Sequence, residues 1–139
     1  MICEVICIDA SVGIKWYNQK EIHAEKALKI REEYINDEID IAVPDIFFYE
    51  VINALRYNPE FRQKDIESAI SSLKEMQLIT VNHDLFLDKI PKIAFDYDIT
   101  VYDASYVAMA KEKNQIFYTA DEKLLKKVDL DFVKHLKEF

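Results

Sequence analysis

Short apolar runs alternate with longer amphipathic segments along this chain of 139 residues, and this alternation constrains the fold more than any other feature. The short runs are rich in Ile and Val, which is typical of strands. The longer segments repeat apolar residues every three or four positions, which is typical of helices that face a core. Strands that alternate with helices indicate an α/β fold, in which a mostly parallel sheet of about five strands carries helices on both faces.

The order of elements follows from these patterns. We expect strands over residues 2–8, 39–43, 78–81, 115–118 and 132–136. We expect helices over residues 10–19, 21–36, 45–57, 62–76, 84–97, 100–113 and 121–127. The sequence has only 1 Gly and 3 Pro, which favours short loops and leaves no glycine-rich cradle for phosphate. No linker or repeat interrupts the series, so we expect residues 1–139 to form a single domain.

Composition and charge limit the classes of protein to which this chain can belong. Half of the residues are hydrophobic, which argues against disorder. No apolar stretch approaches the roughly 20 residues that span a bilayer, and no basic region precedes the first apolar run, so we expect a cytoplasmic protein. The formal net charge of −8 disfavours a large nucleic-acid footprint, although bound divalent cations would offset part of it.

The two cysteines, Cys3 and Cys7, fall on the first expected strand. At about 3.3 Å per residue their Cα atoms lie ~13 Å apart, too far for a mutual disulfide. They could be half of a zinc site, but no second pair completes it, so buried thiols are the favoured interpretation.

Four acidic residues stand where strands end or helices begin: Asp9, Glu50, Asp103 and Asp121. In a parallel sheet the carboxyl ends of the strands converge on one edge, where ligands bind. Four carboxylates gathered there repel one another unless a cation neutralises them. The pattern therefore predicts a divalent-metal site at this edge.

Each acid also has a structural interpretation. Asp9 could cap the helix that follows it, and Asp121 could be a first-turn acid favoured by the helix dipole. Asp103 forms a capping-box spacing with Thr100, and a second such spacing covers residues 119–122. These alternatives require no metal.

Glu50 is harder to explain structurally, because it interrupts the apolar segment 47–52. An unpaired acid on an apolar helix face is costly to bury. Asn53 lies three residues further on, on much the same face, and could orient the carboxylate by a hydrogen bond.

These motifs together resemble those of the PIN-domain family, and most closely its small VapC-type ribonuclease toxins. The matching segments are Ile8-Asp9-Ala10-Ser11, Glu50-Val51-Ile52-Asn53-Ala54-Leu55, Tyr102-Asp103-Ala104-Ser105-Tyr106-Val107 and Thr119-Ala120-Asp121-Glu122. They occur in the family's order and are spread over nearly the whole chain.

The resemblance implies a PIN-like three-layer α/β/α sandwich and hydrolysis of RNA with Mg²⁺ or Mn²⁺ at an acidic pocket. It implies Asp9, Glu50, Asp103 and Asp121 as metal-binding and catalytic residues. It also implies Ser11 and Thr119 as polar neighbours of these acids. We expect Ser11 and Asn53 to orient the carboxylates. The resemblance further implies a homodimer and, for a short chain, a toxin paired with a cognate antitoxin protein.

Several points stay open at this level. Lys15, Arg56 and Lys123 are candidates for phosphate contacts through sequence proximity alone, and each is better explained as an ordinary solvated charge. Trp16 or Tyr17 could serve a dimer interface or the core.

Two alternatives to a toxin nuclease stay open. One is a housekeeping RNA-processing nuclease, and the other is a non-catalytic PIN module that binds RNA or a protein. A haloacid-dehalogenase-like phosphatase would need a second Asp two residues after Asp9, where this chain has Ser11.

Overall fold

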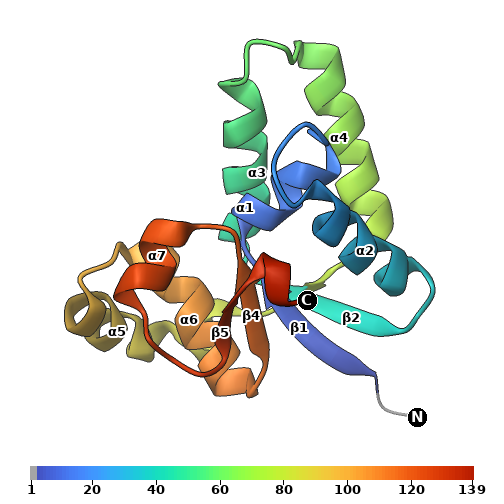
Figure 1. The fold of residues 1–139 in the computed structure, drawn as a ribbon. Coiled ribbons are helices and arrows are strands. Elements are labelled where there is room, and N and C mark those ends of the chain that lie inside the picture. The colour runs from blue at the N-terminus through green and yellow to red at the C-terminus, as the bar shows by residue number, and fades with distance from the viewer. Residues whose placement is uncertain (1–2) are drawn as a thin grey trace.

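The structure is a computed structural model that describes residues 3–139. These residues form a five-stranded sheet, in which all neighbouring strands are parallel. The spatial order is β3-β2-β1-β4-β5, so β1 lies at the centre (Figure 1). The strands are β1 (Glu4–Ile8), β2 (Ile39–Val43), β3 (Ile79–Thr80), β4 (Ile116–Thr119) and β5 (Val133–His135). The predicted parallel α/β fold is confirmed; residue 2, expected in the first strand, lies outside the described residues.

Helices cover both faces of the sheet, as predicted (Figure 1). Helices α1 to α4 lie on one side and α5 to α7 on the other. The helices are α1 (Ala10–Gly13), α2 (Ala24–Ile35), α3 (Ile46–Arg56), α4 (Gln63–Met76), α5 (Ile90–Tyr97), α6 (Val101–Lys113) and α7 (Glu122–Lys127). Short 3₁₀ turns occupy η1 (Ile14–Trp16), η2 (His83–Leu85), η3 (Leu87–Lys89) and η4 (Leu136–Glu138). Within residues 3–139 no helix combines the length and apolarity that crossing a membrane requires.

The helix predicted over residues 84–97 is wrong in its first half. Two 3₁₀ turns, η2 and η3, occupy that half, and α5 begins only at Ile90. Pro91 lies in the first turn of α5. Because proline has no N–H and clashes with the preceding turn, it fits at the start of a helix and not in its middle. Asn82 caps η2 through its side chain, which accepts a hydrogen bond from the Asp84 N–H.

The core lies between the sheet and its helices. Ile6, Cys7 and Ile8 of β1 are almost fully buried, as expected for the central strand of a doubly covered sheet. Residues 104–110 of α6 are also buried, and three of them are alanines. Small side chains allow this helix to approach the sheet closely, which places Asp103 at the edge of the core.

Trp16 belongs to this core and not to an exposed interface. It is 2% exposed, and its indole N–H donates a 2.8 Å hydrogen bond to the Ala27 carbonyl. Tyr17 is half-buried, and its hydroxyl donates to Ser72 Oγ at 3.0 Å. The suggestion that these aromatics serve a dimer is therefore wrong for Trp16 and unsupported for Tyr17. Cys7 is a buried free thiol, and Cys3 is a half-buried one.

Candidate active site at the carboxyl edge of the sheet

The fold brings the four predicted acids to one end of the molecule. Asp9 directly follows β1, and Asp121 lies two residues after the end of neighbouring β4. Asp103 lies in the first turn of α6, and Glu50 lies in the second turn of α3. Asp9, Asp103 and Asp121 lie where strands end or helices begin, and Glu50 lies one turn inside its helix. This is the edge where parallel α/β sheets bind ligands.

Asp9 is the most deeply placed of the four, at 6% exposed. Its Oδ1 accepts hydrogen bonds from the Ser11 N–H at 3.1 Å and from the Ser11 hydroxyl at 2.5 Å. Its Oδ2 accepts a 2.5 Å hydrogen bond from the Thr119 hydroxyl. A carboxylate offers about four lone-pair sites. Three are used here, which leaves Oδ2 able to accept one further partner.

The two hydroxyls that hold Asp9 are themselves held by the backbone after β4. Ser11 Oγ accepts a 2.8 Å hydrogen bond from the Ala120 N–H, and Thr119 Oγ1 accepts one from the Asp121 N–H at 3.1 Å. Each hydroxyl thus accepts from the backbone and donates to Asp9, and the two hydroxyl oxygens lie 3.3 Å from each other. This arrangement fixes the orientation of the Asp9 carboxylate and ties the ends of β1 and β4 together.

Burial raises the pKa of Asp9 to about 7. The Ser11 and Thr119 hydroxyls oppose this effect by stabilising the ionised form, whereas Asp103 and Asp121 add to it by repulsion. Without a cation, the central carboxyl is thus poised to hold a proton near neutral pH. A bound cation would favour the ionised carboxylate instead.

The other acids affect one another in the same way. Burial raises the pKa of Asp103, and the nearby charges of Asp121 and Glu50 raise it further. The charges of Asp121 and Glu50 thus raise the pKa of Asp103, and the charges of Asp103 and Asp121 raise the pKa of Asp9. The four carboxyls share one electrostatic environment, and it is a strongly negative one.

Tyr106 is a site residue that the sequence analysis missed. Its hydroxyl donates a 2.6 Å hydrogen bond to Glu50 Oε1, across the gap between α6 and α3. Burial raises the pKa of Tyr106 well above its usual range, and Glu50 reinforces the shift, so the phenol keeps its proton. The available signal was spacing, because Tyr106 lies three residues after Asp103 and shares its helix face.

Asn53 does not perform the role predicted for it. Within residues 3–139 it makes no hydrogen bond to Glu50, whose partner is Tyr106. Asn53 is exposed and lies beside Glu50 on the open face of α3. Tyr106 reaches Glu50 because a long aromatic side chain from the facing helix spans the gap, which spacing along α3 alone could not reveal.

Helix capping explains part of the placement of these acids but not their mutual proximity. Asp9 caps α1, as the structural interpretation proposed. Asp121 is the N-cap of α7 and accepts a 3.1 Å hydrogen bond from the Leu124 N–H. Thr100 caps α6 by accepting from the Asp103 N–H at 3.0 Å. Thr119 is not the cap of α7, because its hydroxyl is committed to Asp9.

The chemistry of the donor set fits a hard divalent cation, since it consists of carboxylate oxygens with unused lone pairs. Within residues 3–139, however, no three His, Cys, Asp or Glu side chains lie close enough to hold a metal ion as they stand. The mutual repulsion described above acts against such a cluster. A cation would have to draw the carboxylates together.

The three phosphate-contact candidates differ in their surroundings. Lys15 is 4% exposed, and its Nζ lies 2.9 Å from Glu21 Oε1, so it is neither a solvated charge nor available to phosphate. That prediction is wrong for Lys15. Arg56 and Lys123 are exposed and stay candidates.

A parallel sheet with buried and half-buried acids at its carboxyl edge defines an α/β protein that is acidic at the edge where such sheets bind ligands. The chain belongs to the PIN domain family, whose family model matches residues 6–130. It is also 30% identical over 106 residues to the protein named Exonuclease VapC9 from Pyrobaculum aerophilum, a match that covers 76% of this chain and 74% of that one.

Solved structures share the fold. PAE2754 from Pyrobaculum aerophilum superposes with a TM-score of 0.66 at 23% identity, over 98% of this chain and 85% of that one. VapBC2 from Rickettsia felis, bound to a DNA fragment from their promoter, superposes with a TM-score of 0.64 at 11% identity, over 94% of this chain and 96% of that one. Mycobacterium tuberculosis VapC20, described as a sarcin-ricin loop cleaving toxin, superposes with a TM-score of 0.61 at 14% identity, over 91% of this chain and 92% of that one.

Proposed function

We propose that this protein is a divalent-metal-dependent endoribonuclease that hydrolyses phosphodiester bonds of RNA. The observation that carries the proposal is the gathering of Asp9, Glu50, Asp103 and Asp121 at the carboxyl edge, with Asp9 buried and held by two hydroxyls. Membership of the PIN domain family supports a nuclease, as does the name of the Pyrobaculum relative.

We assign roles to residues as follows. Asp9 and Asp103 would bind the principal Mg²⁺ or Mn²⁺, and Asp121 would complete that site or share a second. Glu50, fixed by Tyr106, would bind through water or position the attacking water. Ser11 and Thr119 keep the Asp9 carboxylate in one orientation. The bound cation would lower the pKa of a water and neutralise charge on the phosphate.

The biological role that fits best is the toxin of a type II toxin-antitoxin pair. A structural neighbour is a VapBC assembly, and another is described as a toxin, which supports this role without extending their targets to this chain. A cognate antitoxin, a homodimeric state and a cytoplasmic location belong to the same proposal. So does the single-domain organisation of residues 1–139, since the described residues pack on a common core.

The test is cleavage of a mixed pool of structured and single-stranded RNA by the purified protein in Mg²⁺, Mn²⁺ or EDTA. The Asp103→Asn variant serves as the inactive form. Cleavage that needs metal and disappears in the variant supports the proposal. Cleavage that survives both EDTA and the variant, or no cleavage by the unmodified protein, contradicts it. The products distinguish the two kinds of nuclease: an endonuclease gives internal fragments, whereas an exonuclease releases single nucleotides.

A further inference from the structure

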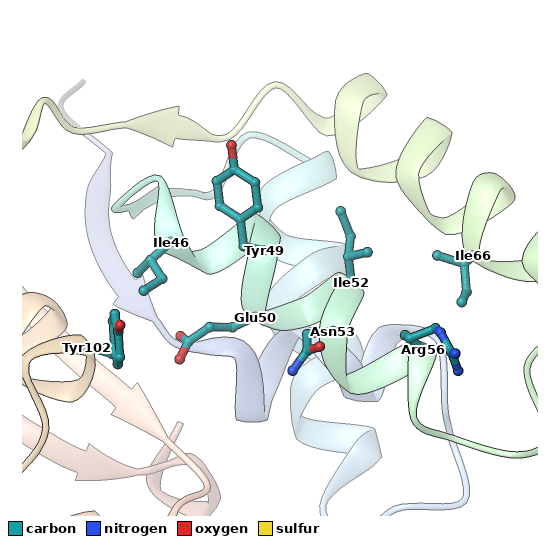
Figure 2. Close-up of a pocket in the computed structure, with 8 residues that line it drawn as sticks. All are labelled: Ile46, Tyr49, Glu50, Ile52, Asn53, Arg56, Ile66 and Tyr102. Atoms are coloured by element: carbon teal, nitrogen blue, oxygen red, sulfur yellow. The ribbon is translucent and has the colours of Figure 1, made fainter.

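Two histidines outside the acidic site lie against each other where the end of β5 meets α2. His23 is the residue before α2, and His135 is the last residue of β5. The centres of their rings are 5.2 Å apart, and the ring planes are inclined at 79°. Figure 1 shows this end of the chain beside α2, and η4 contacts that helix. Neither histidine lines the cavity that opens beside Glu50 on α3 (Figure 2).

His135 holds the turn that follows it. Its Nδ1 accepts a 3.0 Å hydrogen bond from the Lys137 N–H, and its own N–H donates a 3.1 Å hydrogen bond to Glu138 Oε2. The two bonds form a capping box at the start of η4. Within η4, Leu136 is fully buried. Because only an unprotonated Nδ1 can accept a hydrogen bond, the neutral imidazole is part of the structure of this turn.

The turn connects α2 with the sheet through Phe139, the residue after η4. Lys26 of α2 donates a 2.8 Å hydrogen bond to the main-chain oxygen of Phe139. Lys29 Nζ, on the same helix, lies 5.8 Å from the centre of the Phe139 ring. Tyr118 of β4 meets that ring edge-on, with the ring centres 5.4 Å apart. A change in η4 would therefore reach both α2 and β4.

The same segment lies beside the strand end that orients Asp9. His135 is the register partner of Thr119 in the parallel pairing of β4 with β5. Thr119 is fully buried, and its hydroxyl donates to the Asp9 carboxylate. β5 is the last strand in the spatial order of the sheet, so β4 is the strand that holds it. Loosening of β5 would remove one neighbour of Thr119.

A proton on His135 would disrupt this arrangement in two ways. Imidazolium donates from both nitrogens, so Nδ1 could no longer accept from the Lys137 N–H. The new charge would also lie beside His23 and the Lys137 ammonium. Glu122 of α7 and Glu138 act in the opposite direction. His135 Nε2 lies 3.8 Å from Glu122 Oε1, but the Glu122 side chain is 76% exposed, so this ion pair contributes little.

The surroundings of His135 lower its pKa. Burial is the largest cause, and the charges of His23 and Lys137 follow, which together exceed the opposing effect of the two glutamates. An unfolded histidine titrates near pH 6.5, so the unfolded chain binds more protons at this residue than the folded one. The contribution of His135 to stability is therefore present above about pH 6.5 and is lost as the pH falls below it.

We propose that His23 and His135 form a pH-sensitive latch for the end of β5 and for η4. With both imidazoles neutral the latch is closed, and η4 holds β5 against β4. Protonation of His135 opens the latch, because it removes the cap of η4 and adds repulsion from His23. The strand end that carries Thr119 is then held less firmly. The latch thus makes the acidic edge of the sheet sensitive to pH below about 6.5.

Amide hydrogen exchange in EDTA at pH 7.5 and pH 5.5 tests the latch, with each rate divided by the rate of an unstructured chain at that pH. In the unmodified protein, protected amides of residues 133–139 should be roughly 2- to 30-fold less protected at pH 5.5, the range expected for one lost helix cap. The amides of Ala120 and Asp121, which donate to Ser11 and Thr119 beside Asp9, should lose protection in the same direction.

Three variants separate the latch from the other titrating groups. His135→Asn cannot take up a proton but keeps a side-chain acceptor suited to capping η4, so its protection should not fall at pH 5.5. His23→Asn removes the second charge and suits the left-handed backbone at this position, where φ is 64°, so its loss of protection should be smaller. His83→Asn removes the remaining histidine, which lies on η2, and is the matched control that should respond as the unmodified protein does.

An equal loss of protection in His135→Asn and the unmodified protein would overturn the latch, because another group would then control the response. No loss in the unmodified protein would overturn it as well. If His135→Asn does not fold, a response of His23→Asn equal to that of the unmodified protein overturns the pair. Loss confined to residues 133–139 would overturn the link to Thr119. These measurements use neither RNA nor a bound metal, so they test the latch apart from the proposed nuclease function.

Discussion

The Thr119 hydroxyl donates a 2.5 Å hydrogen bond to the Asp9 carboxylate, across 110 residues of sequence. This bond joins the ends of β4 and β1, the two strands that Asp121 and Asp9 follow. It is buried, and the backbone N–H of Asp121 holds its donor in place. The orientation of Asp9 therefore depends on a residue that is not itself an acid.

Replacing Thr119 with Val keeps the shape of the side chain but removes this donor. We expect the Thr119→Val variant to lose about 1–3 kcal/mol of stability, because a buried carboxyl and the Asp121 N–H both lose a partner. Metal-dependent cleavage should also fall. Urea unfolding and cleavage rates measure the two effects. Thr119→Ser, which keeps the hydroxyl, is the control, and it should restore most of both.

The pKa of Asp9, raised to about 7, predicts how stability varies with pH in the metal-free protein. In the unfolded chain Asp9 titrates near pH 4, so between about pH 4 and pH 7 the folded protein binds more protons at this residue. The contribution of Asp9 to stability is therefore largest at low pH and is lost as the pH rises through this window. The melting temperature in EDTA, followed from pH 4.5 to 7.5, measures it.

Asp9→Asn isolates that contribution from the other carboxyls. The difference in melting temperature between the unmodified protein and the variant should shift in favour of the variant as the pH rises. Excess Mn²⁺ should reverse the trend for the unmodified protein alone, because protons compete with the cation for the carboxylate. A difference that does not vary with pH would show that Asp9 is not buried as described.

Tyr106→Phe tests whether the orientation of Glu50 matters. Tyr106 is 1% exposed, and its ring stacks on Phe117 with centroids 5.6 Å apart, so the Phe variant should keep the packing and fold. Glu50 is half-buried and can recruit water in place of the lost hydroxyl. We expect a kcat reduced about 10-fold or more and a small change in melting temperature. Tyr118→Phe, whose hydroxyl makes no hydrogen bond within residues 3–139, should leave kcat unchanged.

Gly13→Ala tests the close contact of α1 with α3, the helix that carries Glu50. A Cβ at Gly13 would lie 2.7 Å from Phe47 Cζ and 3.1 Å from Val51 Cγ2, both in buried side chains. Such overpacking costs about 1–3 kcal/mol. The direction of the effect is informative, because Gly→Ala inside an unobstructed helix is stabilising by about 0.5–1 kcal/mol. A more stable variant in urea unfolding would contradict the packing.

The sequence placed Asp9 and Asp121 at one edge, because the ends of parallel strands converge there. Glu50 and Asp103 lie on helices α3 and α6, and their assignment to the same site came from the family resemblance. It also indicated Ser11 and Thr119, although only as neighbours of the acids. Tyr106 and its bond to Glu50 were missed, since the approach of α6 to α3 depends on packing at long range. Lys15 was misjudged because its pairing with Glu21 depends on the turns after η1.

Titration of Mn²⁺ into the metal-free protein tests the central claim most directly, with the melting temperature as the readout. A cation that binds only the folded state must raise it. We expect a concentration-dependent rise for the unmodified protein and for Asp131→Asn, which removes one exposed charge before β5, at the opposite edge of the sheet. We expect little or no rise for Asp103→Asn. Equal rises in all three proteins, or no rise in any, would show that these four acids do not form a metal site.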